Sequence, residues 1–101
     1  MGYSTLEQVK QILQITETTW DQEIVDCIVD ADQWVDSSLK LFTAVPLTGT
    51  IPGAVVVASK NKAAAFYRER RDPVGAKAYL ETAIATLKDY IQNTYYRGIM
   101  R

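Results

Sequence analysis

The sequence predicts an all-α domain with the architecture of a four-helix bundle, in which a short first helix precedes three longer ones. Apolar residues recur at steps of three and four in four separate segments, the spacing of one face of an α-helix. Capping residues or clustered proline and glycine stand between these segments. With 101 residues, 48% of them hydrophobic, and a net charge of −1, the chain is expected to form one globular domain, residues 1–101.

The first helix is expected to begin at Ser4 or Thr5 and to end near Gln14. Ser4 and Glu7 have the spacing of a capping box, in which each side chain bonds the other residue's backbone N–H. The apolar positions that follow at helical spacing are Leu6, Val9, Ile12 and Leu13.

The second helix is predicted from Thr19 to Phe42, and the rest of the chain is expected to pack around it. Thr19 and Gln22 again have the form of a capping box, and no glycine or proline interrupts the segment. Val25 and Val29 make a second, weaker apolar strip among aspartates, which indicates a second packing partner. The main stripe consists of Ile24, Cys27, Ile28, Ala31, Val35, Ser38, Leu39 and Phe42.

A loop is predicted between the second and third helices, because two prolines and two glycines within residues 46–53 exclude a helix interior. Such a loop is often functional, although a plain crossover fits equally well. The third helix is expected to carry Pro52 in its first turn and to end in the basic run 68–71. Asp72 and Pro73 fit the cap and first residue of the fourth helix, and residues 95–101 are expected to form an extended tail.

The predicted core draws on all four helices. An oligomer would bury more apolar surface than a domain of this size can bury alone. The predicted core residues are Leu6, Val9, Leu13, Ile24, Ile28, Val35, Leu39, Val55, Phe66, Leu80, Ile84, Leu87 and Ile91.

Charge is distributed unevenly along the chain. Residues 1–50 hold two Lys or Arg and eight Asp or Glu, whereas residues 51–101 hold nine and four. The halves therefore carry net charges of −6 and +5. Two interpretations fit this pattern: pairing between the halves of one chain, or head-to-tail association of identical subunits.

The residue types give little support for catalysis. The chain has no histidine, which removes the commonest general base and metal ligand, so we expect no catalytic residue, no cofactor and no metal site. Cys27 lies on the apolar stripe and is expected to be buried. Asp30 and Asp32 begin like a calcium loop, but Trp34, Val35 and Leu41 occupy the positions where the pattern continues with ligands and glycine.

The remaining features suggest an alternative function and argue against a membrane span and a signal peptide. Arg68, Arg70 and Arg71 could bind phosphates, so a small helical nucleic-acid-binding or regulatory module is the alternative function. The slightly acidic whole chain disfavours it. No apolar run approaches the length of a membrane span, and the N-terminal residues lack the features of a signal peptide.

A family resemblance covers most of the chain. It rests on residues 3–10 (YSTLEQVK), 21–28 (DQEIVDCI), 35–39 (VDSSL), 52–58 (PGAVVVA), 63–70 (AAAFYRER), 78–80 (AYL) and 87–91 (LKDYI). In these stretches the chain resembles the small head-tail connector proteins of tailed bacteriophages, which act as neck adaptors in head completion.

The resemblance implies a structural, non-enzymatic virion protein at the head-tail interface, made in the host cytoplasm. Such a protein forms a ring of about twelve copies beneath the portal, extends the DNA channel without binding DNA specifically, and docks the next neck, stopper or tail protein. It also implies portal contacts in the C-terminal tail and contacts to neighbours or the neck in the loop. The portal candidates are Tyr95, Tyr96, Arg97, Ile99, Met100 and Arg101, and the loop candidates are Val45, Pro46, Leu47 and Thr48.

Contacts between subunits are expected where the charged halves and the weaker apolar strip lie. If Trp34 is buried only in an oligomer, it marks an interface, and if it is buried in the monomer it belongs to the core. The interface candidates are Val25, Val29, Asp30, Asp32, Trp34, Arg68, Arg70 and Arg71.

Overall fold

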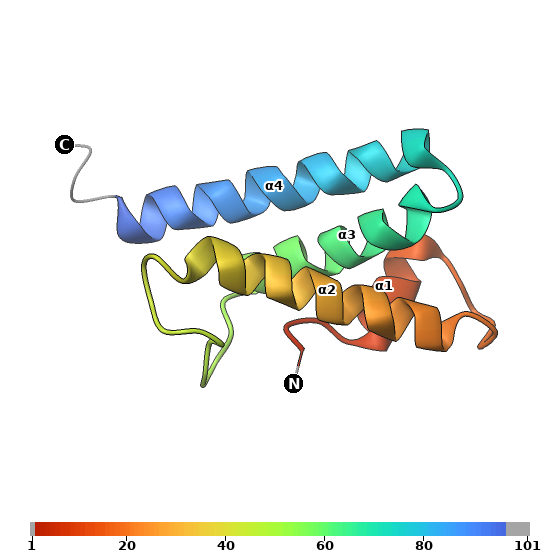
Figure 1. The fold of residues 1–101 in the computed structure, drawn as a ribbon, viewed down its shortest axis with the longest axis horizontal. Helices are drawn as coiled ribbons and strands as arrows, with labels where there is room; N and C mark the ends of the chain where they lie inside the picture. Colours follow the sequence, from red (N-terminus) through yellow and green to blue (C-terminus); the bar gives the residue numbers. More distant parts are fainter. Residues whose placement is uncertain (1, 97–101) are drawn as a thin grey trace.

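The computed structural model describes residues 2–96, which form four α-helices and, within this range, no strand (Figure 1). Helix α1 spans Leu6–Leu13, α2 spans Asp21–Leu39, α3 spans Gly53–Glu69 and α4 spans Pro73–Tyr95. The predicted all-α fold, with a short first helix and three longer ones, is therefore confirmed.

Helix α3 is the centre of the fold. Helix α4 packs along one side of it and α2 along another, while α1 packs against α2 and α3 (Figure 1). Small residues make this close packing possible, because Ala58, Ser59, Ala63, Ala64 and Ala65 on α3 are all buried. The result is an elongated, flat molecule of 48 × 29 × 18 Å in which α4 contacts mainly one other helix.

Two helix starts differ from the sequence prediction. In α1 the capping box joins Thr5 and Gln8, one residue later than predicted, because Tyr3 holds the preceding residues against α2. The box predicted at Thr19 is absent: α2 begins after Trp20 without a side-chain cap, and the Gln22 amide donates to Asp26 on the next turn.

The other helix ends are closer to the prediction. Asp72 caps α4 by accepting a hydrogen bond from the Gly75 N–H, and Pro73 is the first residue of that helix, as predicted. Pro52 is the residue before α3 rather than a member of its first turn. Helix α2 ends at Leu39, three residues before the predicted end, and residues 40–42 form a turn.

The core consists of two clusters. The first joins α1, α2 and the C-terminal half of α3, and it contains the buried Cys27. The second joins Tyr3, the C-terminal part of α2, the start of α3 and Leu87 of α4. The buried members of the predicted core are Val9, Leu13, Ile24, Ile28, Val35, Leu39, Val55 and Leu87.

The prediction overestimates how much of α4 is buried. Ile84 was expected in the core but is 47% exposed, and Leu80 and Ile91 are only half-buried. The reason is that α4 rests mainly on α3, so a narrow line of Ala76, Ala83 and Leu87 faces the core. Among residues 2–96, no helix covers one apolar side of α4.

Candidate functional site

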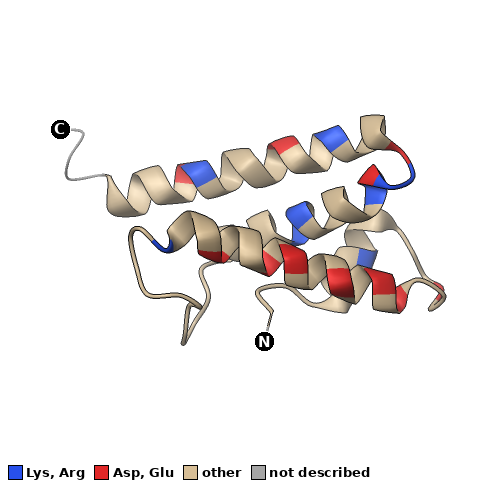
Figure 2. Cartoon of the chain, in the orientation of Figure 1, with Lys and Arg blue, Asp and Glu red and all other residues tan. Residues whose placement is uncertain are grey.

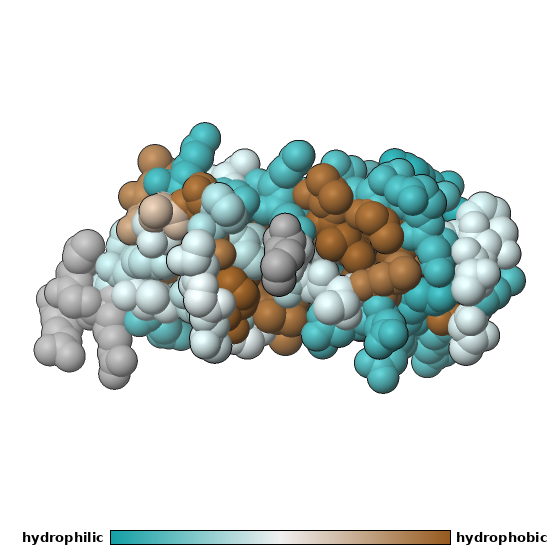
Figure 3. Space-filling view, turned by 90° about the horizontal axis from the view of Figure 1, so that it is seen from below, coloured by the Kyte–Doolittle hydropathy of each residue, from teal (hydrophilic) through white to brown (hydrophobic). Residues whose placement is uncertain are grey.

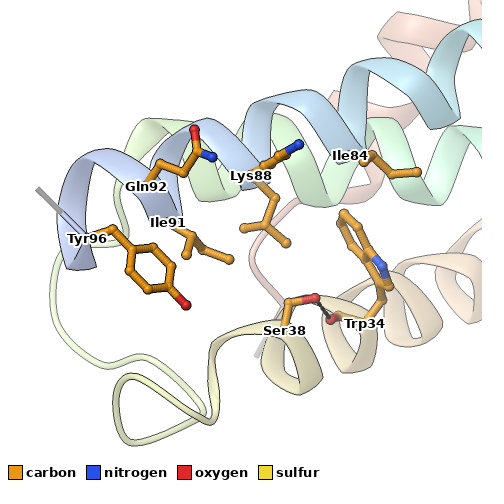
Figure 4. A pocket seen from close by; sticks show the side chains of 8 residues that line it. Trp34, Ser38, Ile84, Lys88, Ile91, Gln92 and Tyr96 are labelled. Carbon is orange, nitrogen blue, oxygen red and sulfur yellow. Dashed lines mark hydrogen bonds between the residues drawn. The ribbon is translucent and has the colours of Figure 1, made fainter. Parts of the chain in front are cut away.

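A groove of about 410 Å³ runs between α2 and α4 (Figure 4). Figure 4 shows Ile84 and Ile91 on α4 facing the Trp34 side of α2 across the opening. The Ser38 hydroxyl donates to the Trp34 carbonyl at 2.9 Å, so its polar group is bonded within α2. The residues lining the groove are Trp34, Ser38, Ile84, Leu87, Lys88, Ile91, Gln92 and Tyr96.

A cation lies beside this groove. The ammonium of Lys62, on α3, is 4.9 Å from the ring centroid of Trp34 and 4.9 Å from that of Phe66. Burial lowers the pKa of this lysine, because the charged form loses solvation. Within residues 2–96, no carboxylate oxygen lies within 4.0 Å of the Lys62 or Lys88 ammonium. Two rings contact the Lys62 charge, and Glu69 favours it from a greater distance.

Trp34 is neither fully buried in the monomer nor fully exposed for a contact between subunits. Its residue is half-buried and packs against the second core cluster. It also contributes to the wall of the open groove. Trp34 thus belongs to the core on one side and is available for an external contact on the other.

The outer face of α2 carries a second exposed apolar surface, made by Val25 and Val29, which are 38% and 49% exposed. Figure 3 shows hydrophobic side chains gathered on the face seen from below. Asp26 and Asp30 lie beside these valines on exposed turns of α2, and neither makes an ion pair within the described part of the chain. We call Val25, Val29, Asp26 and Asp30 the outer strip.

The other acidic residues of α2 bind groups of the same chain. Asp21 pairs with Lys10 at 2.8 Å. Asp32, predicted as an interface residue, is half-buried and accepts hydrogen bonds from the Tyr3 N–H at 3.1 Å and the Ser59 hydroxyl at 2.9 Å. Burial is the main reason why the pKa of Asp32 is raised. Asp32 therefore has a role inside the subunit that the sequence prediction missed.

Arg71, another predicted interface residue, is also used within the chain. Its guanidinium makes a paired hydrogen bond with Glu23 at 2.7 and 3.0 Å, and lies 4.0 Å from the Tyr67 ring centroid and 4.9 Å from that of Trp20. The hydrogen bond from Arg71 holds the pKa of Glu23 below its usual value. Arg70 adds a longer contact to Glu23, at 3.7 Å.

The ion pairs of Glu23 join the acidic and basic halves of the chain. Acidic residues are concentrated along α2, whereas α3 carries several basic ones (Figure 2). Glu23 joins the two halves of the chain through Arg70 and Arg71. Arg68 is half-buried and makes no ion pair within the described residues. Pairing within the chain is thus real, but within residues 2–96 it includes no ion pair of the outer strip, Lys62 or Lys88.

Tyr3 is a key residue that the sequence interpretation missed. It is 7% exposed, and its hydroxyl donates to Asp36 and accepts from the Leu47 N–H at 2.8 Å. Burial first, and then the bond to Asp36, raise the pKa of Tyr3 to about 12. One side chain therefore fastens the N-terminal residues and the loop after α2 to the same helix.

The predicted loop contacts divide into two pairs. Val45 and Leu47 are half-buried and pack against the second core cluster, so they hold the loop in place. Pro46 and Thr48 are exposed and remain available to a partner.

The predicted portal contacts lie at the end of α4, and one of them packs within the molecule. Tyr95 is the last residue of α4, where the fourth helix is expected to end, and its ring stacks on Phe42 with centroids 5.0 Å apart. Tyr96 is 36% exposed and lines the groove. The remaining candidates, Arg97, Ile99, Met100 and Arg101, lie outside the described residues.

Residues 2–96 contain no group of three or more Cys, Asp or Glu side chains arranged to hold a metal ion. No helix among them is long and apolar enough to cross a bilayer. The site is therefore described by its two apolar surfaces and their charges. Comparisons with protein-family models, with curated proteins and with solved structures give no match to this chain.

Proposed function

We propose that this protein is a structural subunit of a bacteriophage or prophage neck, forming a ring of about twelve copies beneath the portal. The observation that carries the proposal is the presence of two unlike exposed apolar surfaces, the groove and the outer strip, on one small domain. A ring requires such a pair, because each copy must offer one face to the copy before it and a different face to the copy after it. The resemblance to head-tail connectors supplies the biological setting.

In this proposal the C-terminal end contacts the portal. The stacking of Phe42 on Tyr95 brings the loop after α2 and the end of α4 to the same end of the molecule (Figure 1). Residues 96–101 would extend toward the portal from this end, and the exposed Pro46 and Thr48 would contact neighbouring copies beside it. The opposite end, with α1 and the turn between α3 and α4, would then face the next neck or tail protein.

The test is a mass measurement of the chain alone and mixed with the portal protein of the same phage. The expected result is a complex with about twelve copies of this chain per portal ring. A variant ending at Tyr96 should keep the helix content measured by circular dichroism and lose portal binding. If neither a ring nor a portal complex forms at any concentration, the proposal fails.

The alternative, a nucleic-acid-binding module, has less support. Two of the three arginines on which it depends are bound to Glu23, and Arg71 is also covered by two aromatic rings. The free phosphate contacts would be reduced mainly to Arg68. The variant Arg68→Ala/Arg70→Ala leaves the Arg71 pair intact, so a loss of salt-dependent DNA binding in that variant would favour the alternative.

A further inference from the structure

We propose, building on the ring function above, that the groove between α2 and α4 receives the outer strip of α2 from a second copy of this chain. Val25 and Val29 of one copy would enter the groove of the next. Asp26 and Asp30 would then meet the cations Lys62 and Lys88. Apolar burial, charge and the directions of the two surfaces each support this pairing.

The first argument is the missing cover on α4. Ile84 is 47% exposed, and the groove places it with Ile91 and Trp34 in one apolar opening. Removing such side chains from water stabilises an association by about 25 cal/mol per Å² of apolar surface. A helix with two protruding valines one turn apart, about 6 Å along its axis, has the form that such a groove accepts.

The second argument is charge. Lys62 is held over two aromatic rings in a partly desolvated position that lowers its pKa. No carboxylate within residues 2–96 lies within 4.0 Å of its ammonium, and Glu69 favours the charge only from farther away. Lys88 is a further cation on the rim of the groove. The outer strip supplies complementary groups, because Asp26 and Asp30 are exposed and make no ion pair within the described residues. An incoming carboxylate would therefore add a close ion pair to a cation that has only the more distant Glu69 in the described part of its own subunit.

The third argument is direction. Val25 and Trp34 are separated by nine residues of one helix, and at about 100° per residue they lie about 180° apart around α2. The valines of the outer strip therefore face away from the groove, whereas Asp30 stands one turn before Trp34, near the edge of the groove. A copy can offer its valines to one neighbour and its groove to the other. The contact is heterologous and repeats from copy to copy, as a ring requires.

The experiment uses two variants that each destroy one surface. Val29→Lys places a cation on the outer strip, and Ile84→Asp places a carboxylate in the groove. Both positions are about half exposed, so neither change empties the core. Val74→Lys is the matched control, because Val74 is 85% exposed and lies outside both surfaces. Self-association is measured by sedimentation velocity up to about 1 mM, the range in which weak contacts appear.

The expected result is that each variant alone stays monomeric, while an equimolar mixture of the two forms dimers and no larger species. Only that mixture contains one intact strip and one intact groove that can meet. Val74→Lys should assemble like the wild type. Asp30→Lys should weaken assembly at least about tenfold, and mixing it with Lys88→Glu should restore pairwise binding by joining the two reversed charges.

Three results would overturn the inference: a wild type that stays monomeric throughout the range, single variants that assemble normally, or a mixture that forms no dimer. If Ile84→Asp self-associates normally but loses portal binding, the groove holds a portal segment instead. Portal binding is scored separately, so the outcomes for the two proposals can be told apart. A ring that survives both variants leaves the neck function standing, whereas strip-to-groove dimers without portal binding would reject the neck function alone.

Discussion

Replacing Tyr3 with Phe removes one oxygen atom from a side chain that fastens two segments to α2. The ring stays in the second core cluster, but the Leu47 N–H loses its acceptor and Asp36 loses its donor. A hydrogen bond contributes about 0.5–1.5 kcal/mol net when neutral and about 1.5–3 kcal/mol when one partner is charged. The variant is therefore expected to lose about 2–4 kcal/mol of unfolding free energy at neutral pH.

The same substitution changes how stability depends on pH. The pKa of Tyr3 is raised to about 12 in the folded protein, against about 10 for an unfolded tyrosine. Between these values the folded state binds more protons than the unfolded state, so stability falls as pH rises. A difference of about two pK units corresponds to about 3 kcal/mol. The wild type should lose this contribution between about pH 10 and 12, whereas the Phe variant has no such group.

The assay is urea denaturation followed by circular dichroism, at neutral pH and at steps up to pH 12. Tyr79→Phe is the matched control, because its hydroxyl makes only a 3.5 Å contact to the Ile12 carbonyl and should contribute little. The gap between the wild type and Tyr3→Phe should narrow above pH 10. If the two have equal midpoints at neutral pH, or if the gap is constant up to pH 12, the proposed role of the hydroxyl is wrong.

Three further substitutions test other contacts by the same urea assay. Arg71→Ala should lower the free energy of unfolding by about 1–2 kcal/mol, because it removes a paired hydrogen bond to Glu23 and two ring contacts. Arg70→Ala, which removes only a 3.7 Å contact, should lower it by less than about 0.5 kcal/mol. Equal losses in the two variants would contradict this reasoning. Asp32→Ala should cost about 1–3 kcal/mol by leaving two donors without an acceptor, while Asp32→Asn keeps an acceptor oxygen and should cost clearly less. Ala64→Leu should cost about 1–3 kcal/mol by overfilling the contact around α3, and an unchanged midpoint would show that this contact is loose.

The number and kind of helices could be predicted from the sequence because periodicity and caps are local signals. Asp72 and Pro73 illustrate this, since a carboxylate acceptor and a residue without an N–H suit a helix start in any surroundings. The start of α1 shows the limit. Both Ser4 with Glu7 and Thr5 with Gln8 have capping-box spacing, and the distant contact of Tyr3 with α2 selects the second.

The site could be predicted only in part, for two physical reasons. Periodicity identifies an apolar face but not whether another helix covers it, so Ile84 was assigned to the core although it borders an open groove. The role of Tyr3 depends on partners 33 and 44 residues away, and no local pattern marks such contacts. Val25 and Val29 could be recognised as a separate apolar strip, because valines among aspartates on one helix face do not fit a single buried stripe, and both are exposed in the structure. Their contact with a neighbouring subunit stays a prediction.

Most carboxylates of α2 contact other segments of the subunit. Helix α2 contains six acidic residues and no basic one. Four of the six hold other segments in place: one binds α1, one binds the turn after α3, one binds both the N-terminal residues and α3, and one binds the N-terminal residues alone. The remaining pair, Asp26 and Asp30, stand one turn apart, where like charges repel by a few tenths of a kcal/mol. Within the described subunit the Gln22 amide donates to Asp26, and neither carboxylate makes an ion pair. In the proposed assembly the cations of a neighbouring groove would offset the repulsion between the two.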